Sequence, residues 1–253
     1  MFMMKTASLI TAIIAVVIIV ATAYFALSMR SGPESAILSA RELLTRNVSL
    51  TYNIVVSPTF TINSELPGIS GIPFQSGQLM GVITISRTPI NDATVINGTL
   101  SFRHFIKTSN NFDLAFWRYD NELCYAMELN FLGLQTITHC VSYVNVTKYV
   151  ITVLNESKYI GTGMWNGKTT YCFTAAITMT PSQGGAQELP LIINVTKICI
   201  LNNGIPTNMS IYVYPEQQVG FGNMLMNINM TLLSYSFTFN QYEFTQVTKG
   251  LIP

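Results

Sequence analysis

The sequence predicts a mainly β protein. An N-terminal transmembrane helix and a short amphipathic helix precede one strongly curved antiparallel sheet or open barrel of about ten strands. Three observations predict this class: an uncharged apolar stretch after Lys5, helical spacing of apolar residues up to residue 46, and alternating β-branched and aromatic residues from Val48 onward. We divide the chain into an anchor or signal segment, residues 1–30, and an extracytoplasmic β-rich domain, residues 31–253.

The N-terminal segment decides the cellular compartment. Residues 7–27 carry no charged side chain, and as a helix they are long enough to cross a hydrocarbon layer about 30 Å thick. Their length favours an uncleaved single-pass membrane anchor. Ala21-Thr22-Ala23 would suit cleavage of a secretory signal, and a pilin-type leader processed close to Lys5 is a third alternative.

The first element after this segment is an amphipathic helix over residues 33–46. Ser31 and Glu34 have the spacing of a capping box at its start. Ile37 and Leu43 belong to the apolar positions that recur along it at helical spacing.

Turn signals then divide the β region into strands. Four of them predict hairpins or turns: Asn97-Gly98, Asp120-Asn121, Asn166-Gly167 and Asn202-Asn203-Gly204. Residues 57–78 are rich in proline and glycine and exceed the usual length of a loop, so we expect a flap there that packs on something.

The C-terminal strand carries the predicted ligand-binding face. Alternate residues from Met224 to Leu232 are apolar, and from Leu233 to Phe239 the apolar residues take the opposite phase. Because side chains in a strand repeat every two residues, the phase change predicts a β-bulge near Leu232-Leu233. The predicted ligand-binding residues, with a flap residue included, are Met224, Met226, Ile228, Met230 and Phe74; the face from Tyr235 to Phe239 is the alternative lining.

The four cysteines are placed symmetrically about two predicted turns. This symmetry pairs Cys124 with Cys140 and Cys172 with Cys199, because residues equidistant from a hairpin turn face each other across the ladder. The sequence has no Cys-x-x-Cys pair, so the spacing indicates disulfides rather than a metal site.

Potential glycosylation sites are numerous. Seven Asn-x-Ser/Thr sequons follow the apolar stretch: Asn47, Asn97, Asn145, Asn155, Asn194, Asn208 and Asn229. With an even number of cysteines, they favour an oxidising compartment outside the cytoplasm.

Composition and motifs exclude several functions. Only 10% of the residues are charged and the net charge is +1, so the chain lacks the basic patch of a nucleic-acid-binding protein. We find no nucleophile elbow and no phosphate-binding loop, and we expect no cofactor, no metal and no enzymatic activity. The alternative is a secreted hydrolase that uses the acidic residues Asp113, Asp120, Glu122 and Glu128.

Two resemblances extend this interpretation. The Ile-, Val-, Tyr- and Asn-rich composition, the short Lys-containing leader and the crowded sequons resemble uncharacterised membrane-anchored surface glycoproteins of thermoacidophilic crenarchaea such as Sulfolobus. Residues 35–56 (SAILSARELLTRNVSLTYNIVV) look similar to the opening of the lipoprotein-carrier (LolA-like) fold, although no lipobox cysteine is present near the N-terminus. This second resemblance implies an apolar sheet face that binds acyl chains or lipidated partners.

We therefore expect a membrane-anchored, glycosylated binding or envelope-scaffold protein that holds a lipid-like ligand or an envelope protein partner. A pilin-like or membrane-complex structural subunit is the alternative, and the oligomeric state is left open.

Overall fold

A computed structural model describes residues 32–62, 72–75, 78–102, 109–129, 137–142, 146–179, 191–215 and 222–249. The predicted membrane segment, residues 7–27, lies outside them. In the described part of the chain, no helix is both long and apolar enough to cross a membrane.

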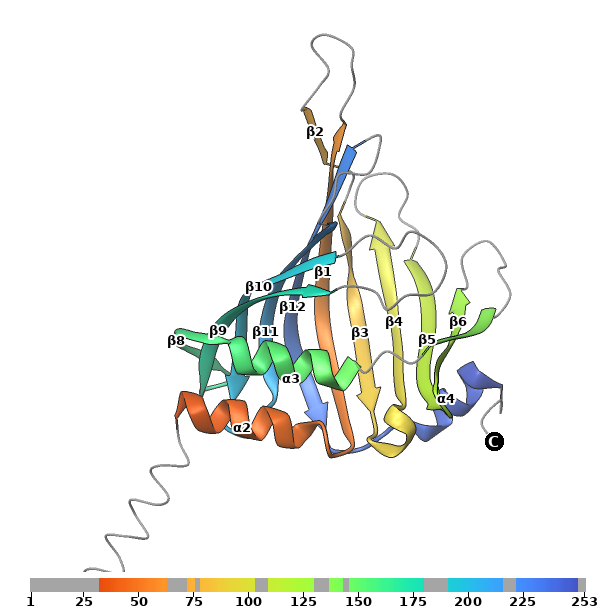
Figure 1. Cartoon of the computed structure of the whole chain (residues 1–253), viewed down its shortest axis with the longest axis horizontal. Helices are drawn as coiled ribbons and strands as arrows, with labels where there is room; N and C mark the ends of the chain where they lie inside the picture. The colour runs from red at the N-terminus through yellow and green to blue at the C-terminus, as the bar shows by residue number, and fades with distance from the viewer. Residues whose placement is uncertain are drawn as a thin grey trace, which may run out of the picture.

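One antiparallel sheet of twelve strands makes up most of the described structure (Figure 1). Its first half consists of β1 (Val48–Ile62), β2 (Ile72–Gln75), β3 (Leu79–Arg87), β4 (Thr94–Phe102), β5 (Ser109–Tyr119), β6 (Glu122–Leu129) and β7 (Ile137–Ser142). Its second half consists of β8 (Lys158–Trp165), β9 (Lys168–Met179), β10 (Leu191–Leu201), β11 (Pro206–Pro215) and β12 (Gly222–Ser236).

The strand order is β7-β6-β5-β4-β3-β1-β12-β11-β10-β9-β8, with β2 paired to β1 beside this path. The first and last strands, β1 and β12, therefore meet at the centre of the sheet. From β3 to β7 each strand lies further from the centre than the one before, and from β8 to β11 each strand lies nearer to it. β7 and β8 end the order without pairing with each other, so the sheet is open. The predicted mainly β, antiparallel class is confirmed, with twelve strands where about ten were expected.

The helices cover different faces of this sheet. Helix α2 (Pro33–Leu43) and helix α3 (Val146–Glu156) contact each other, α2 contacts β9 and β10, and α3 contacts β9 (Figure 1). Helix α4 (Gln241–Thr248) packs against β4, β5 and β6. Of these three helices, only α2 was predicted from the sequence. The sequence did contain a signal for α4, because Asn240 and Glu243 have capping-box spacing. In the structure, the Asn240 side chain accepts a hydrogen bond from the backbone N–H of Glu243.

Helix α2 starts at Pro33 as predicted but ends earlier, and Ser31 of the predicted capping box lies outside the described residues. Its N-cap is Gly32, with no side-chain cap, and Pro33 occupies the first turn. Because proline has no backbone N–H, the first turn has one donor fewer to satisfy. The helix ends at Leu43, and the backbone N–H groups of Thr45 and Arg46 donate to the carbonyls three residues earlier in a tightened last turn. The predicted helix over residues 33–46 was therefore too long.

The bulge in β12 lies where the phase change predicted it. Thr51 pairs with Ser234 and Tyr52 with Leu232, so Leu233 is the extra residue opposite β1. The bulge places Leu232 in the core, where it is 2% exposed, and leaves Leu233 50% exposed.

Three of the four predicted turns are present. Asp120-Asn121 joins β5 to β6, Asn166-Gly167 joins β8 to β9, and residues 202–204 turn between β10 and β11. Asp120, Asn166, Gly167 and Gly204 have positive φ, which the turns require.

The hairpin at Asn97-Gly98 was wrong, because both residues lie inside β4. A Cβ at Gly98 would come within 2.5 Å of the Val82 carbonyl oxygen on β3. This glycine thus permits close approach of two strands. The chain turns instead at residues 88–93, around the short 3₁₀ helix η1 (Ile90–Asp92).

The predicted flap was partly wrong as well. Its start continues β1 as far as Ile62, and Ile72–Gln75 returns as β2 and pairs with residues 59–62. Residues 63–71, 76 and 77 of the expected flap lie outside the described structure. Pro58 in β1 and Pro73 in β2 concealed this strand extension, because proline is a turn signal when it is taken locally.

Both predicted disulfides are present. Cys124 pairs with Cys140, directly opposite it in β6 and β7, and Cys172 pairs with Cys199, directly opposite it in β9 and β10. One group of possible metal ligands occurs among the described residues, Glu122 with Cys124 and Cys140. The sulfurs of this group are joined to each other, so they cannot act as thiolate ligands.

Candidate ligand-binding face

The register separates the side chains of the sheet into two faces of different chemistry. One face, the apolar face, includes Tyr52, Ile54 and Val56 of β1 with their partners on the neighbouring strands. Those partners are Ile83 and Leu79 on β3 and Leu232, Met230 and Ile228 on β12. Further from the centre, Met209 and Ile211 on β11 and Leu100 and Phe112 on β4 and β5 continue it. Successive side chains of a strand point to opposite faces, so the alternating apolar residues that predict these strands also form the apolar face.

Burial on the apolar face is high at one end of the strands and lower at the other. On β1, Val48, Leu50 and Tyr52 are at most 8% exposed, whereas Ile54 and Val56 are only partly buried. On β12, Leu232 and Met230 belong to the core, whereas Ile228 and Met226 are partly exposed. The core is therefore closed beside α2 and opens toward the end of the sheet where β1 extends to β2.

Helices α2 and α3 close the face at one side only. Ala36 and Ala40 of α2 and Leu154 of α3 form a buried cluster with Phe173 of β9 and Ile200 of β10. In the described part of the chain, the main packing contacts of the two helices are with each other and with β9 and β10, and none is with the central strands β3, β1 and β12. The apolar residues of the central strands thus remain partly uncovered by helix.

Two aromatic side chains under this face have their polar atoms hydrogen-bonded. The Tyr52 hydroxyl donates to the Pro206 carbonyl at 2.9 Å, and Trp165 Nε1 donates to the Leu232 carbonyl at 2.9 Å. Burial raises the pKa of Tyr52, so its hydroxyl stays neutral. These bonds fix the closed end of the face without placing a charge there.

The predicted ligand-binding residues fall on this face to different degrees. Met226 and Ile228 are partly exposed on it, whereas Met230 is 8% exposed and belongs to the core. The register aligns the backbones of Met224 and Phe74 with Phe60 of β1, one on each side. The side chains of Met224 and Phe74 lie outside the described structure.

The alternative lining, the face from Tyr235 to Phe239, does not form one surface. Tyr235 packs against Trp165 with ring centroids 5.9 Å apart, and Phe237 is 51% exposed beside it. Phe239 packs instead against Phe244 of α4. The residues on β3, β4 and β5 were missed, although the alternation of Phe112, Leu114 and Phe116 was a signal for them.

The opposite face of the sheet, the polar face, carries hydroxyl, amide and carboxyl groups, and among the described residues only where α4 covers it does it carry a buried apolar cluster, which includes Val95, Ala115 and Trp117. One row across it consists of Thr51, Thr84, Asn97, Asp113 and Glu128. All four sequon asparagines of the described strands lie on this face: Asn97, Asn194, Asn208 and Asn229. Of the other sequons, Asn47 precedes β1, Asn155 is in α3, and Asn145 lies outside the described residues.

Part of the predicted acidic cluster comes together on the polar face. Asp113 lies opposite Glu128, and its carboxyl group hydrogen-bonds Glu243 of α4. Partial burial, followed by the charges of Glu243 and Glu128, raises the pKa of Asp113. Asp120 and Glu122 are exposed at the turn and do not join this group. Glu243 was missed because it comes from a helix that was not predicted.

Replacing Asp113 with Asn is expected to reduce the dependence of stability on pH. Because the native pKa of Asp113 is raised, its contribution to stability is present below the unfolded pKa of about 3.9 and is lost as pH rises through the native pKa. Asn cannot ionise, so the variant should melt at a higher temperature than the wild type at pH 7 and close to it at pH 3. Thermal melting at both pH values measures this, with Asp120→Asn in the exposed turn as control. A difference from wild type that is the same at pH 3 and pH 7 would contradict the assignment.

No family model matches the chain, and no curated protein matches it. Among solved structures, the chain is similar to a β-barrel-like protein of domain of unknown function DUF1849 from Brucella abortus. That alignment has 9% identity and a TM-score of 0.28, and it covers 74% of this chain and 98% of the other. A likeness at this level supports no conclusion about function.

Proposed function

We propose that this chain is a membrane-anchored, extracytoplasmic binding protein whose apolar face holds a lipid-like ligand. The observation that carries the proposal is the decrease in burial along that face, from the closed core at Tyr52 to the partly exposed Ile54, Val56 and Ile228. Each apolar side chain that a ligand covers contributes through removal of its surface from water, at about 25 cal/mol per Å².

The different chemistry of the two sheet faces supports a ligand on the apolar face. Glycans at the strand sequons would lie on the polar face and leave the apolar face accessible. Among the residues named on the apolar face, Tyr52 alone has an ionisable side chain, and it stays neutral in the core beneath the partly exposed residues. Such a surface suits an acyl chain better than a charged or strongly polar ligand.

The experiment is native mass spectrometry of the full chain, extracted gently from its own membranes. The proposal predicts a population of the chain that carries an additional mass in the range of one lipid. It also predicts that stripped protein regains this mass when it is mixed with a total lipid extract. Stripped, folded protein that takes up no lipid would contradict the proposal.

A structural subunit is the second candidate, and the edge strand β8 favours it. Among the described strands, β8 pairs only with β9, and Tyr159, Ile160 and Met164 on β8 are 48%, 53% and 72% exposed. An exposed apolar edge strand is a template for pairing with another chain. The same mass spectrum tests this candidate, which predicts multiples of the chain mass or a discrete partner protein in place of the bound lipid.

A further inference from the structure

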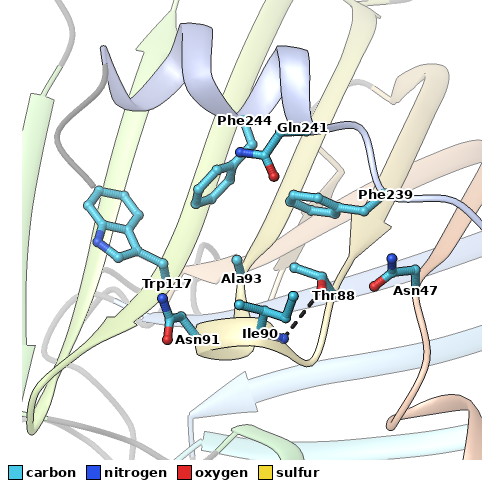
Figure 2. Close-up of a pocket in the computed structure, with 9 residues that line it drawn as sticks. All are labelled: Asn47, Thr88, Ile90, Asn91, Ala93, Trp117, Phe239, Gln241 and Phe244. Atoms are coloured by element: carbon cyan, nitrogen blue, oxygen red, sulfur yellow. Dashed lines mark hydrogen bonds between the residues drawn. The ribbon is translucent and has the colours of Figure 1, made fainter. Parts of the chain in front are cut away.

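A pocket of about 280 Å³ lies on the other side of the sheet from the apolar face, between α4 and η1 (Figure 2). Its lining is aromatic and amide in character, and it consists of Asn47, Thr88, Ile90, Asn91, Ala93, Trp117, Phe239, Gln241 and Phe244. Its volume is at the lower limit for pockets that bind drug-sized molecules, so it suits a group the size of one ring.

The apolar floor of the pocket is built from packed aromatic rings. Trp117 meets Phe244 edge-on, with centroids 6.0 Å apart, and Phe239 meets Phe244 at 5.5 Å. Trp117 of β5 and Phe244 of α4 are each 3% exposed, so both rings are buried between the strand and the helix. The rim adds the exposed amides of Asn91 and Gln241. No lining residue carries a charge, which favours a neutral ligand with both hydroxyl groups and C–H surfaces.

The turn at the rim is held in place by several interactions. Asn91 and Asp92 both have positive φ, a backbone conformation that costs free energy in residues other than glycine. Arg87 holds this turn by an ion pair with Asp92 at 3.3 Å, and the backbone N–H of Ile90 donates to the Thr88 hydroxyl. These bonds fix Ile90 at the rim, where the side chain is 71% exposed.

The pocket has a candidate occupant within the chain itself. Asn47 is the acceptor of the sequon Asn47-Val48-Ser49, and it lines the pocket. Figure 2 shows its side-chain amide at the edge of the pocket beside Thr88 and Phe239, across from Trp117. A sugar attached to Asn47 Nδ2 would therefore begin at the mouth of a pocket whose lining suits one sugar ring.

Asn47 also differs from the other sequon asparagines whose side chains are described. It is exposed in the short connection between α2 and β1, whereas Asn229 is in a strand and accepts a hydrogen bond from Ser210. Asn155 in α3 accepts a hydrogen bond from Arg41. An exposed connection is the usual place for a glycosylated asparagine.

We propose that Asn47 carries an N-linked glycan whose first sugar packs in this pocket against Phe239 and Ile90 and stabilises α4 on the sheet. The sugar covers the exposed apolar rim, and its hydroxyl groups bond the amides of Asn91 and Gln241. The pocket is thus an internal glycan-binding site and not a site for a soluble substrate. This inference rests on the proposed extracytoplasmic location.

The test compares two variants at Ser49 in the full chain, made in the native organism. Ser49→Ala removes the sequon and keeps the Asn47 side chain, whereas Ser49→Thr keeps the sequon. Glycopeptide mass spectrometry measures occupancy, and amide hydrogen exchange measures opening of α4, residues 241–248. We expect Asn47 to be modified in wild type and Ser49→Thr, and α4 to exchange several-fold faster in Ser49→Ala. Asn155→Gln, which removes a sequon remote from the pocket, should leave the exchange of α4 unchanged.

The outcomes separate this inference from its premise. Absence of glycan at every sequon would overturn the inference and also remove the support that the sequons give to the extracytoplasmic location. Glycans at other sequons with Asn47 unmodified would overturn the inference alone. Equal exchange of α4 in Ser49→Ala and Ser49→Thr, with Asn47 modified only in the latter, would also overturn it.

Discussion

Replacing Val56 with Asp is expected to release the lipid-like ligand, whereas the same replacement at Val55 is expected to leave it bound. The two valines are neighbours on β1 and both are partly exposed, but they point to opposite faces. Val56 lies between Ile228 and Leu79, and Val55 lies between Asn229 and Met80. A carboxylate at Val56 would have to lose its water when an acyl chain covers the apolar face.

The cost of removing water from a carboxylate is large compared with the energy of binding. Burial of an uncompensated polar group costs roughly 1–3 kcal/mol in proteins and more for a charge, so affinity should fall by at least about tenfold. The fraction of chains carrying lipid mass in native mass spectra measures this. Circular dichroism and melting curves of both variants show whether each is folded. Equal loss of lipid in two folded variants, or equal retention, would contradict the assignment of the binding face.

Removing the disulfide between Cys172 and Cys199 is expected to lower the free energy of unfolding by about 3.5 kcal/mol. The bridge closes a sequence separation of 27 residues, and both sulfurs lie in residues that are at most 4% exposed. Its loss enlarges the unfolded ensemble by the entropy of that loop. The double variant Cys172→Ala with Cys199→Ala avoids an unpaired buried thiol.

The second disulfide supplies the matched comparison. Cys124 and Cys140 close a separation of 16 residues, for which the same relation gives about 3 kcal/mol. Guanidinium unfolding of the two double variants and the wild type, in the same detergent, measures both effects. A loss below about 1 kcal/mol at Cys172–Cys199 would show that the bridge contributes little to stability.

Local patterns predicted the features of this fold that depend on neighbouring residues. The phase change at Leu232-Leu233 located the bulge because the period of two is a property of each strand by itself. The symmetry of the cysteines gave both disulfides for the same reason. Asn166-Gly167 forms a hairpin and Asn97-Gly98 does not, although the dipeptide is identical. What distinguishes them is the adjacent strand: Asn97 and Gly98 pair with Thr84 and Ile83 of β3, and no local pattern contains that pairing.

Long-range pairing was the part that the sequence did not reveal. The contact of β1 with β12 at the centre of the sheet joins the two ends of the β region. This pairing brings Ile54 beside Met230, so it builds the apolar face that was predicted from β12 alone. Glu243 meets Asp113 for a similar reason, because α4 packs against β5. The membrane anchor, the glycans and the two family resemblances stay predictions.

The most direct test of the binding face is photo-crosslinking with a fatty acid that carries a diazirine on its acyl chain. The probe is added to the stripped full-length protein, and the labelled residues are mapped by peptide mass spectrometry. We expect labels on the partly exposed apolar residues of β1, β11 and β12, among them Val56 and Ile228, and few on Val55 or Asn229. Labels concentrated on the polar face, or divided equally between the two faces, would contradict it.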